Sequence, residues 1–124
     1  MLSLADVRAA RERIGDAATH TPTQYSNTFS RFTEAEIFLK CEQFQRTGAF
    51  KIRGATNRVA TLPEADREAG VVTASAGNHA QGVALAATRA GVDATIVMPE
   101  HAPISKVKAT EGYGGRVVLE GRNY

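Results

Sequence analysis

Strand-like and helix-like segments alternate along the second half of the chain, and this alternation constrains the fold more than any other feature. Apolar segments at residues 71–75, 94–98 and 116–120 are expected to be strands. Helical segments at residues 78–90 and 103–113 separate them, and each is followed by glycine. Strands that alternate with helices of this length form a parallel sheet through right-handed crossovers. The sequence therefore predicts an α/β fold, a parallel sheet with flanking helices.

The first half of the chain predicts two more helices and one strand. A capping box beginning at Ser3, followed by apolar residues at helical spacing, predicts a surface helix over residues 4–17. Within residues 36–42, the apolar residues Ile37, Leu39 and Cys41 occupy every second position, which predicts a strand. Apolar residues at helical spacing then predict a helix that begins near Lys51 and ends before Pro63.

Composition excludes several classes of function. The 124 residues carry a formal charge of +2 from 15 basic and 13 acidic residues, which are scattered and form no basic tract for nucleic acid. Cys41 is the only cysteine, so no intrachain disulfide can form, as fits a reducing cytoplasm. No apolar run reaches the length of a membrane span. His20 and His101 have no carboxylate or cysteine at ligand spacing, so we expect no metal site and a cytoplasmic protein without nucleic-acid or membrane partners.

Lys51 is a candidate nucleophile because of its neighbours. Phe50 and Ile52 are apolar, and the positive end of a helix dipole would lie beside the amine. Both effects disfavour the charged ammonium and favour the reactive neutral amine. The competing interpretation is an ordinary solvated surface lysine at a helix start.

The loop from Ser75 to Gly82 is a candidate anion site, because it follows a strand and opens a helix. Free backbone N–H groups and glycines at such a position favour a carboxylate or a phosphate. The loop matches neither the dinucleotide-binding nor the nucleoside-triphosphate glycine pattern. The alternative is a tight turn capped by Ser75 or Asn78, with His79 as either a general base or a capping residue.

These two segments, TGAFKIRGA at residues 47–55 and SAGNHAQG at residues 75–82, resemble the signatures of a known family. The family is that of threonine dehydratase (threonine ammonia-lyase) and serine racemase, which are fold type II pyridoxal phosphate enzymes. The resemblance extends from about His20 to Tyr124. It implies that residues 1–50 are the N-terminal segment of a large cofactor domain. Residues 51–124 would be most of a small α/β domain, apparently truncated.

The resemblance implies a role for each candidate residue. Lys51 would form the Schiff base with pyridoxal 5'-phosphate, Phe50 would pack near its ring, and Asn78 would bind its phenolic oxygen. The substrate carboxylate would be held by Ser75, Gly77 and His79. The implied substrates are L-threonine, converted to 2-oxobutanoate and ammonia, and L-serine. The full-length relative is expected to be a homo-oligomer.

Ala76 bears on which reaction the family resemblance implies. Racemisation requires a second proton carrier opposite Lys51, and racemases of the family carry serine where this chain has Ala76. A methyl group carries no proton, so we expect a dehydratase. Ala49 replaces a serine found in many relatives and favours the degradative type. The choice between threonine, serine and a hydroxyaspartate stays open.

The cofactor's phosphate loop and the partner of its pyridine nitrogen belong to the C-terminal half of the family, and this chain has neither motif. We therefore expect an N-terminal fragment that is inactive alone. The alternatives are a non-catalytic module that binds an amino acid or a partner and, within the family, a serine racemase.

Overall fold

The second half of the chain forms the predicted parallel sheet. The computed structural model describes residues 1–122, and its strands β3 (Val71–Ala74), β4 (Ala94–Met98) and β5 (Arg116–Leu119) lie in the order β3-β4-β5. Both pairs are parallel, with Val71 opposite Ala94 and Thr95 opposite Arg116. Helix α5 (Asn78–Arg89) connects the first pair and α6 (Ile104–Gly112) the second. The predicted α/β class is confirmed, and the predicted elements differ from these by at most one residue at either end.

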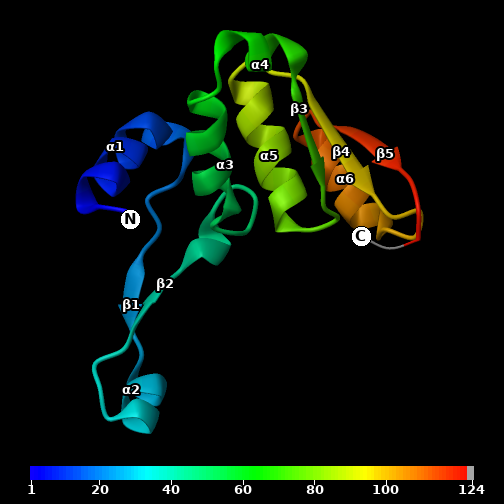
Figure 1. Ribbon diagram of the computed structural model, residues 1–124. Helices are drawn as coiled ribbons and strands as arrows, with labels where there is room; N and C mark the ends of the chain where they lie inside the picture. Colours follow the sequence, from blue (N-terminus) through cyan, green and yellow to red (C-terminus); the bar gives the residue numbers. More distant parts are fainter. Residues whose placement is uncertain (123–124) are drawn as a thin grey trace.

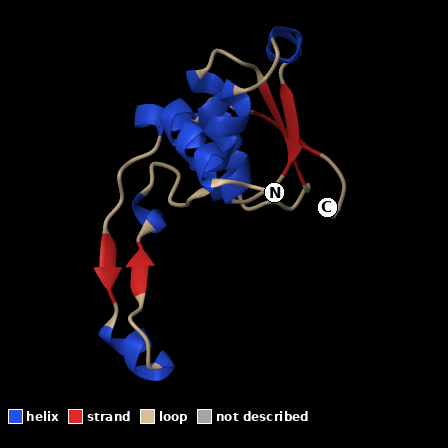
Figure 2. Cartoon of the chain, turned by 60° about the vertical axis from the view of Figure 1, so that its left-hand side comes forward, coloured by secondary structure: helices blue, strands red, loops and turns tan. Residues whose placement is uncertain are grey.

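The helices α3 (Lys51–Ala60), α5 and α6 gather on one side of this sheet (Figure 2). In β4 the side chains of Ala94, Ile96 and Met98 are buried beneath the helices, while Thr95 and Val97 between them are only half-buried. This alternation follows from the period-two geometry of a strand. The core is completed by small residues of α5 and by Ile52 and Val59 of α3.

Helix α3 begins at Lys51, where the sequence predicts it, and ends at Ala60, before Pro63. A short helix that was not predicted, α4 (Glu64–Ala69), follows it and leads into β3. Helix α4 has only six residues and none of them is buried. It therefore lacks the apolar periodicity that sequence analysis depends on.

The N-terminal helix α1 (Leu4–Ile14) has the predicted capping box: the hydroxyl of Ser3 accepts from the Asp6 N–H, and the Asp6 carboxylate accepts from the Ser3 N–H. A 3-10 turn, η1 (Gly15–Ala17), completes the predicted span. Arg13 donates to the Asn57 side chain at 2.8 Å, which ties α1 to α3.

Residues 23–40 form an arm that extends away from the helices (Figure 1). Strands β1 (Thr23–Tyr25) and β2 (Phe38–Lys40) pair in antiparallel fashion, and α2 (Asn27–Thr33) connects them. The predicted strand at 36–42 is shorter than expected because Glu42 begins a second 3-10 turn, η2 (Glu42–Phe44). Strand β1 and helix α2 were not predicted. Among residues 1–122, no helix is long and apolar enough to cross a membrane.

Candidate functional site

Lys51 is the first residue of α3, and its side chain is exposed. The loop before it is anchored by Gln45, Thr47 and Ala49, which are buried. Phe50 is 59 % exposed, and the Lys51 Nζ lies 5.3 Å from the centroid of its ring. The chain therefore presents an amine and an aromatic face together on its surface, at the positive end of a helix dipole.

The turn between β3 and α5 places the second set of predicted residues. The Ser75 hydroxyl accepts a hydrogen bond from the Gly77 N–H at 3.2 Å. Gly77 is the N-cap of α5, and among residues 1–122 no side chain caps this helix. The alternative of a turn held by Ser75 or Asn78 is therefore met in part, since Ser75 closes the turn, whereas Asn78 is the first residue of α5 and not its N-cap. A glycine N-cap leaves the N–H groups of the first helical turn free for an anion.

Gly82 brings Lys51 and α5 together. A methyl group placed at Gly82 would lie 3.1 Å from the carbonyl carbon of Lys51 and 3.3 Å from the N atom of Ile52. Gly82 is buried, and Asn78 lies one helical turn before it, on the same face of α5. The structure thus places the amine-bearing residue beside the first two turns of α5, which begin at the predicted anion site.

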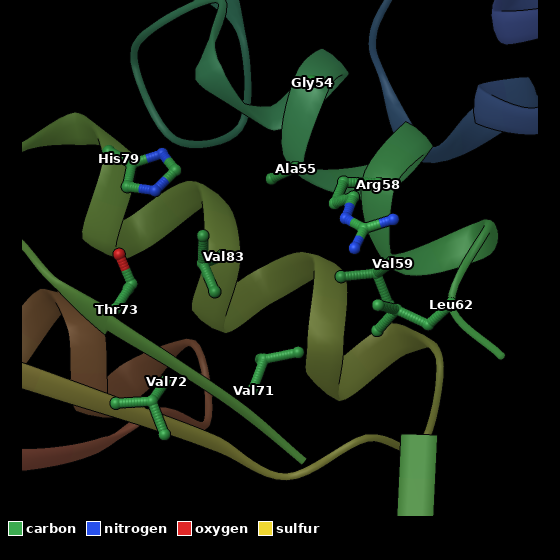
Figure 3. Close-up of a pocket in the computed structure, with 10 residues that line it drawn as sticks. All are labelled: Gly54, Ala55, Arg58, Val59, Leu62, Val71, Val72, Thr73, His79 and Val83. Atoms are coloured by element: carbon green, nitrogen blue, oxygen red, sulfur yellow. The ribbon is translucent and has the colours of Figure 1, made fainter. Parts of the chain in front are cut away.

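His79 faces a groove between α3, α5 and strand β3 (Figure 3). Apolar residues such as Val59, Val71 and Val83 line this groove, and Arg58 lies at its other end. His79 is exposed, and no hydrogen bond of its ring to another described residue is present. The turn between the carboxyl end of β3 and the start of α5 holds four of the predicted site residues: Ser75, Gly77, Asn78 and His79.

Glu42 and Arg53 form an ion pair close to this site that sequence analysis missed. The Arg53 guanidinium donates twice to the Glu42 carboxylate, at 2.8 and 3.0 Å, and Thr21 donates to it at 2.6 Å. The hydrogen bonds from Arg53 lower the pKa of Glu42 to about 2, against the opposing effect of burial, and those from Thr21 and Gln45 add to the decrease. This pair connects η2, which follows the arm, to α3 at a position two residues after Lys51.

The only signal of this pair in the sequence is a pair of opposite charges, because Glu42 and Arg53 lie eleven positions apart in different elements, η2 and α3. No periodicity relates such positions. Within residues 1–122, no group of three or more histidine, cysteine or acidic side chains is arranged to hold a metal ion.

Comparisons with known proteins identify the family of this chain. The family model described as "Pyridoxal-phosphate dependent enzyme" matches residues 14–124. The chain is 51 % identical over 121 residues to the L-threonine ammonia-lyase of Thermotoga maritima and 52 % identical over 117 residues to the serine racemase of Schizosaccharomyces pombe. These matches cover 98 % and 94 % of this chain, but only 30 % and 36 % of the relatives.

Solved structures likewise match most of this chain but only part of their own length. The structure of maize serine racemase superposes with a TM-score of 0.86 at 42 % identity, over 96 % of this chain and 36 % of that one. The processed form of threonine deaminase isoform 2 from Solanum lycopersicum superposes with a TM-score of 0.82 at 37 % identity, over 99 % and 37 %. The chain thus spans about a third of the length of these relatives. The match over residues 14–124 establishes that the chain belongs to the family of pyridoxal-phosphate-dependent enzymes.

Proposed function

We propose that this chain is the N-terminal part of a threonine/serine dehydratase, which converts L-threonine to 2-oxobutanoate and ammonia. The observation that carries the proposal is the close approach of Lys51 to α5, whose N-terminus has no side-chain cap within the described residues. We assign residues 1–50 to the large domain and 51–124 to the small domain of the complete enzyme.

The residues of this chain suit one side of a pyridoxal phosphate site. Lys51 offers an exposed amine, and Phe50 offers an exposed aromatic face 5.3 Å from it. When bound, this cofactor supplies an aldehyde for the lysine amine and a ring that takes up electrons from the substrate α-carbon. Lys51, Phe50 and Asn78 would hold it.

The rest of the mechanism follows from what these residues can donate and accept. The free N–H groups at the start of α5, with Ser75, Gly77 and His79, suit the carboxylate of an amino acid. With the substrate bound, the free amine of Lys51 would accept the proton of the α-carbon. The β-hydroxyl would leave with a proton as water, and hydrolysis of the resulting enamine by one water would yield the 2-oxo acid and ammonia.

Ala76 supports elimination over racemisation. It is half-buried and packs against the hydrophobic core. Its methyl group has no proton to deliver to the α-carbon, whereas elimination requires proton abstraction on the Lys51 side alone. The named relatives include both ammonia-lyases and racemases at about 50 % identity. Similarity to these relatives does not favour either reaction, so the proposal of elimination rests on Ala76.

The test is an assay of the full-length protein with L-threonine and L-serine. We expect ammonia and the 2-oxo acid as products, with no D-serine. Lys51→Ala should abolish the absorbance band of lysine-bound pyridoxal phosphate and lower ammonia release by about 10²–10⁴-fold or more. Lys108→Ala, at an exposed lysine of α6, is the matched control and should change neither.

Each alternative has its own signature in this assay. Sustained formation of D-serine by the unmodified protein would establish the racemase instead. Absence of the cofactor band, together with binding of an amino acid in calorimetry, would establish the non-catalytic binding module and overturn the proposal.

A further inference from the structure

We propose that Gly82 and Tyr113 are positioning residues for Lys51, and this inference rests on the proposed function of Lys51. Neither residue belongs to the set assigned to the cofactor or the substrate. Each contacts the segment that carries Lys51 from another part of the chain: Gly82 from α5, and Tyr113 from the residue that follows α6.

The contact at Gly82 is made with backbone. A Cβ at this position would lie 3.1 Å from the Lys51 carbonyl carbon, 3.3 Å from the Ile52 N atom and 3.3 Å from the Lys51 Cβ. Such separations are tighter than ordinary van der Waals contact, and two of the three atoms belong to the backbone of α3. A side-chain rotation cannot relieve them. Any residue larger than glycine must therefore move the start of α3 away from α5 by a few tenths of an ångström.

The contact at Tyr113 holds the other end of the same segment. The Tyr113 hydroxyl donates to the Arg46 carbonyl at 2.6 Å, across 67 residues of sequence. Tyr113 is itself held from α5, because the Thr88 hydroxyl donates to its carbonyl at 2.9 Å. The loop that leads into Lys51 is therefore bounded by Tyr113 at its beginning and by Gly82 at its end.

This arrangement sets the distance between Lys51 and the anion site. Asn78 lies one turn before Gly82 on α5, so the helix face that contacts Lys51 also begins the turn assigned to the substrate. A lysine that must take a proton from a bound substrate is sensitive to small displacements, and a misplacement of about 1 Å can cost about a hundredfold in rate. A smaller shift at Gly82 should cost about tenfold in kcat.

The experiment compares Gly82→Ala with Gly112→Ala in the full-length protein. Gly112 is also helical, and a methyl group there would meet nothing within 4 Å, so it reproduces the same chemical change without the contact. We expect Gly82→Ala to lower kcat for ammonia release about tenfold with little change in KM, and to slow attachment of pyridoxal phosphate to Lys51. Gly112→Ala should match the unmodified protein in both. A purely structural role would lower the melting temperature and leave kcat and the attachment rate of the folded protein unchanged, and that result would overturn the proposal for Gly82.

Tyr113→Phe provides an independent variant that adds no atoms and removes only the hydroxyl that binds Arg46. It tests the position of the segment that carries Lys51 even if Gly82→Ala does not fold. We expect the rate at which pyridoxal phosphate attaches to Lys51 to decrease by about threefold to tenfold. Rates equal to those of the unmodified protein would overturn the inference for Tyr113. Failure of the proposed function is distinguished by Lys51→Ala, because cofactor attachment unaffected by that change would remove the role of Lys51 itself.

Discussion

Ala76 connects a single side chain to the choice of reaction. It lies between the end of β3 and the start of α5, next to Gly77, where the proposed substrate carboxylate would bind. Because the position is half-buried, a hydroxyl introduced there would be shielded in part from water.

We predict that Ala76→Ser adds racemisation to elimination. The new hydroxyl would supply the proton carrier that the methyl group lacks, while Lys51 would still abstract the α-proton. The measurement is D-serine formed from L-serine by the full-length variant, with ammonia release recorded in parallel. A variant that releases ammonia normally and forms no D-serine would show that this position does not select the reaction.

At the scale of secondary-structure elements, the Glu42–Arg53 pair joins η2, which follows the arm, to the helix that carries Lys51. The Glu42 side chain is 16 % exposed and that of Arg53 is 36 % exposed, so solvent screens the pair only in part. Glu42 also accepts hydrogen bonds from Thr21 and Gln45. These donors favour the ionised carboxylate, because both of its oxygens then act only as acceptors.

This pair predicts a pH dependence of stability. The pKa of Glu42 falls from its ordinary 4.5 to about 2 on folding, with the hydrogen bonds from Arg53 as the main cause. A lowered pKa stabilises the fold fully above pH 4.5, and this contribution is lost as the pH falls from 4.5 towards 2. Glu42→Gln should therefore cost about 1–3 kcal/mol at pH 7, after allowance for solvent screening, and about nothing near pH 2.

The measurement is the free energy of unfolding of the full-length protein across this pH range. Asp16→Asn is the matched control, because Asp16 also pairs with an arginine, Arg89, at 3.4 Å, but its side chain is 97 % exposed. Exposed pairs of this kind contribute little. Equal pH dependence in Glu42→Gln and the unmodified protein would refute the assigned role of Glu42.

At the scale of the whole molecule, one face of the sheet and much of the arm are apolar and exposed. Val72 of β3 is 75 % exposed, although parallel sheets are usually covered on both faces. On the arm, Phe29, Phe32 and Phe38 are all more than half exposed. Lys51 and Phe50 are likewise open to water.

We predict that residues 1–124, expressed alone, bind pyridoxal phosphate weakly and release little or no ammonia from L-threonine. An open site neither excludes water nor surrounds the cofactor, so its electrostatic contacts are weak. The measurement compares the cofactor absorbance band and ammonia release of this piece with those of the full-length protein, with circular dichroism to verify folding. Ammonia release by the folded piece at a rate near that of the full-length protein would contradict the prediction.

Sequence reasoning succeeded where local patterns repeat. The helix beginning at Lys51, the strands at 71–75 and 94–98, and the turn that opens α5 all carry periodicity, glycine or capping signals that act over a few residues. The elements β1, α2 and α4 were not predicted, since three-residue strands and helices of six or seven residues are too short to show periodicity, even though Ser26 caps α2 and Gly70 ends α4.

The α/β class, the place of Lys51 at a helix start and the glycine-containing turn after β3 could all be predicted from the sequence, because they depend on neighbours along the chain. Three contacts could not be predicted and came from the folded structure: Gly82 contacts the backbone of Lys51, Tyr113 donates to the Arg46 carbonyl, and Arg53 pairs with Glu42. These contacts join residues from 11 to 67 positions apart. The path of the folded backbone creates them, and a linear pattern of residue types does not encode that path.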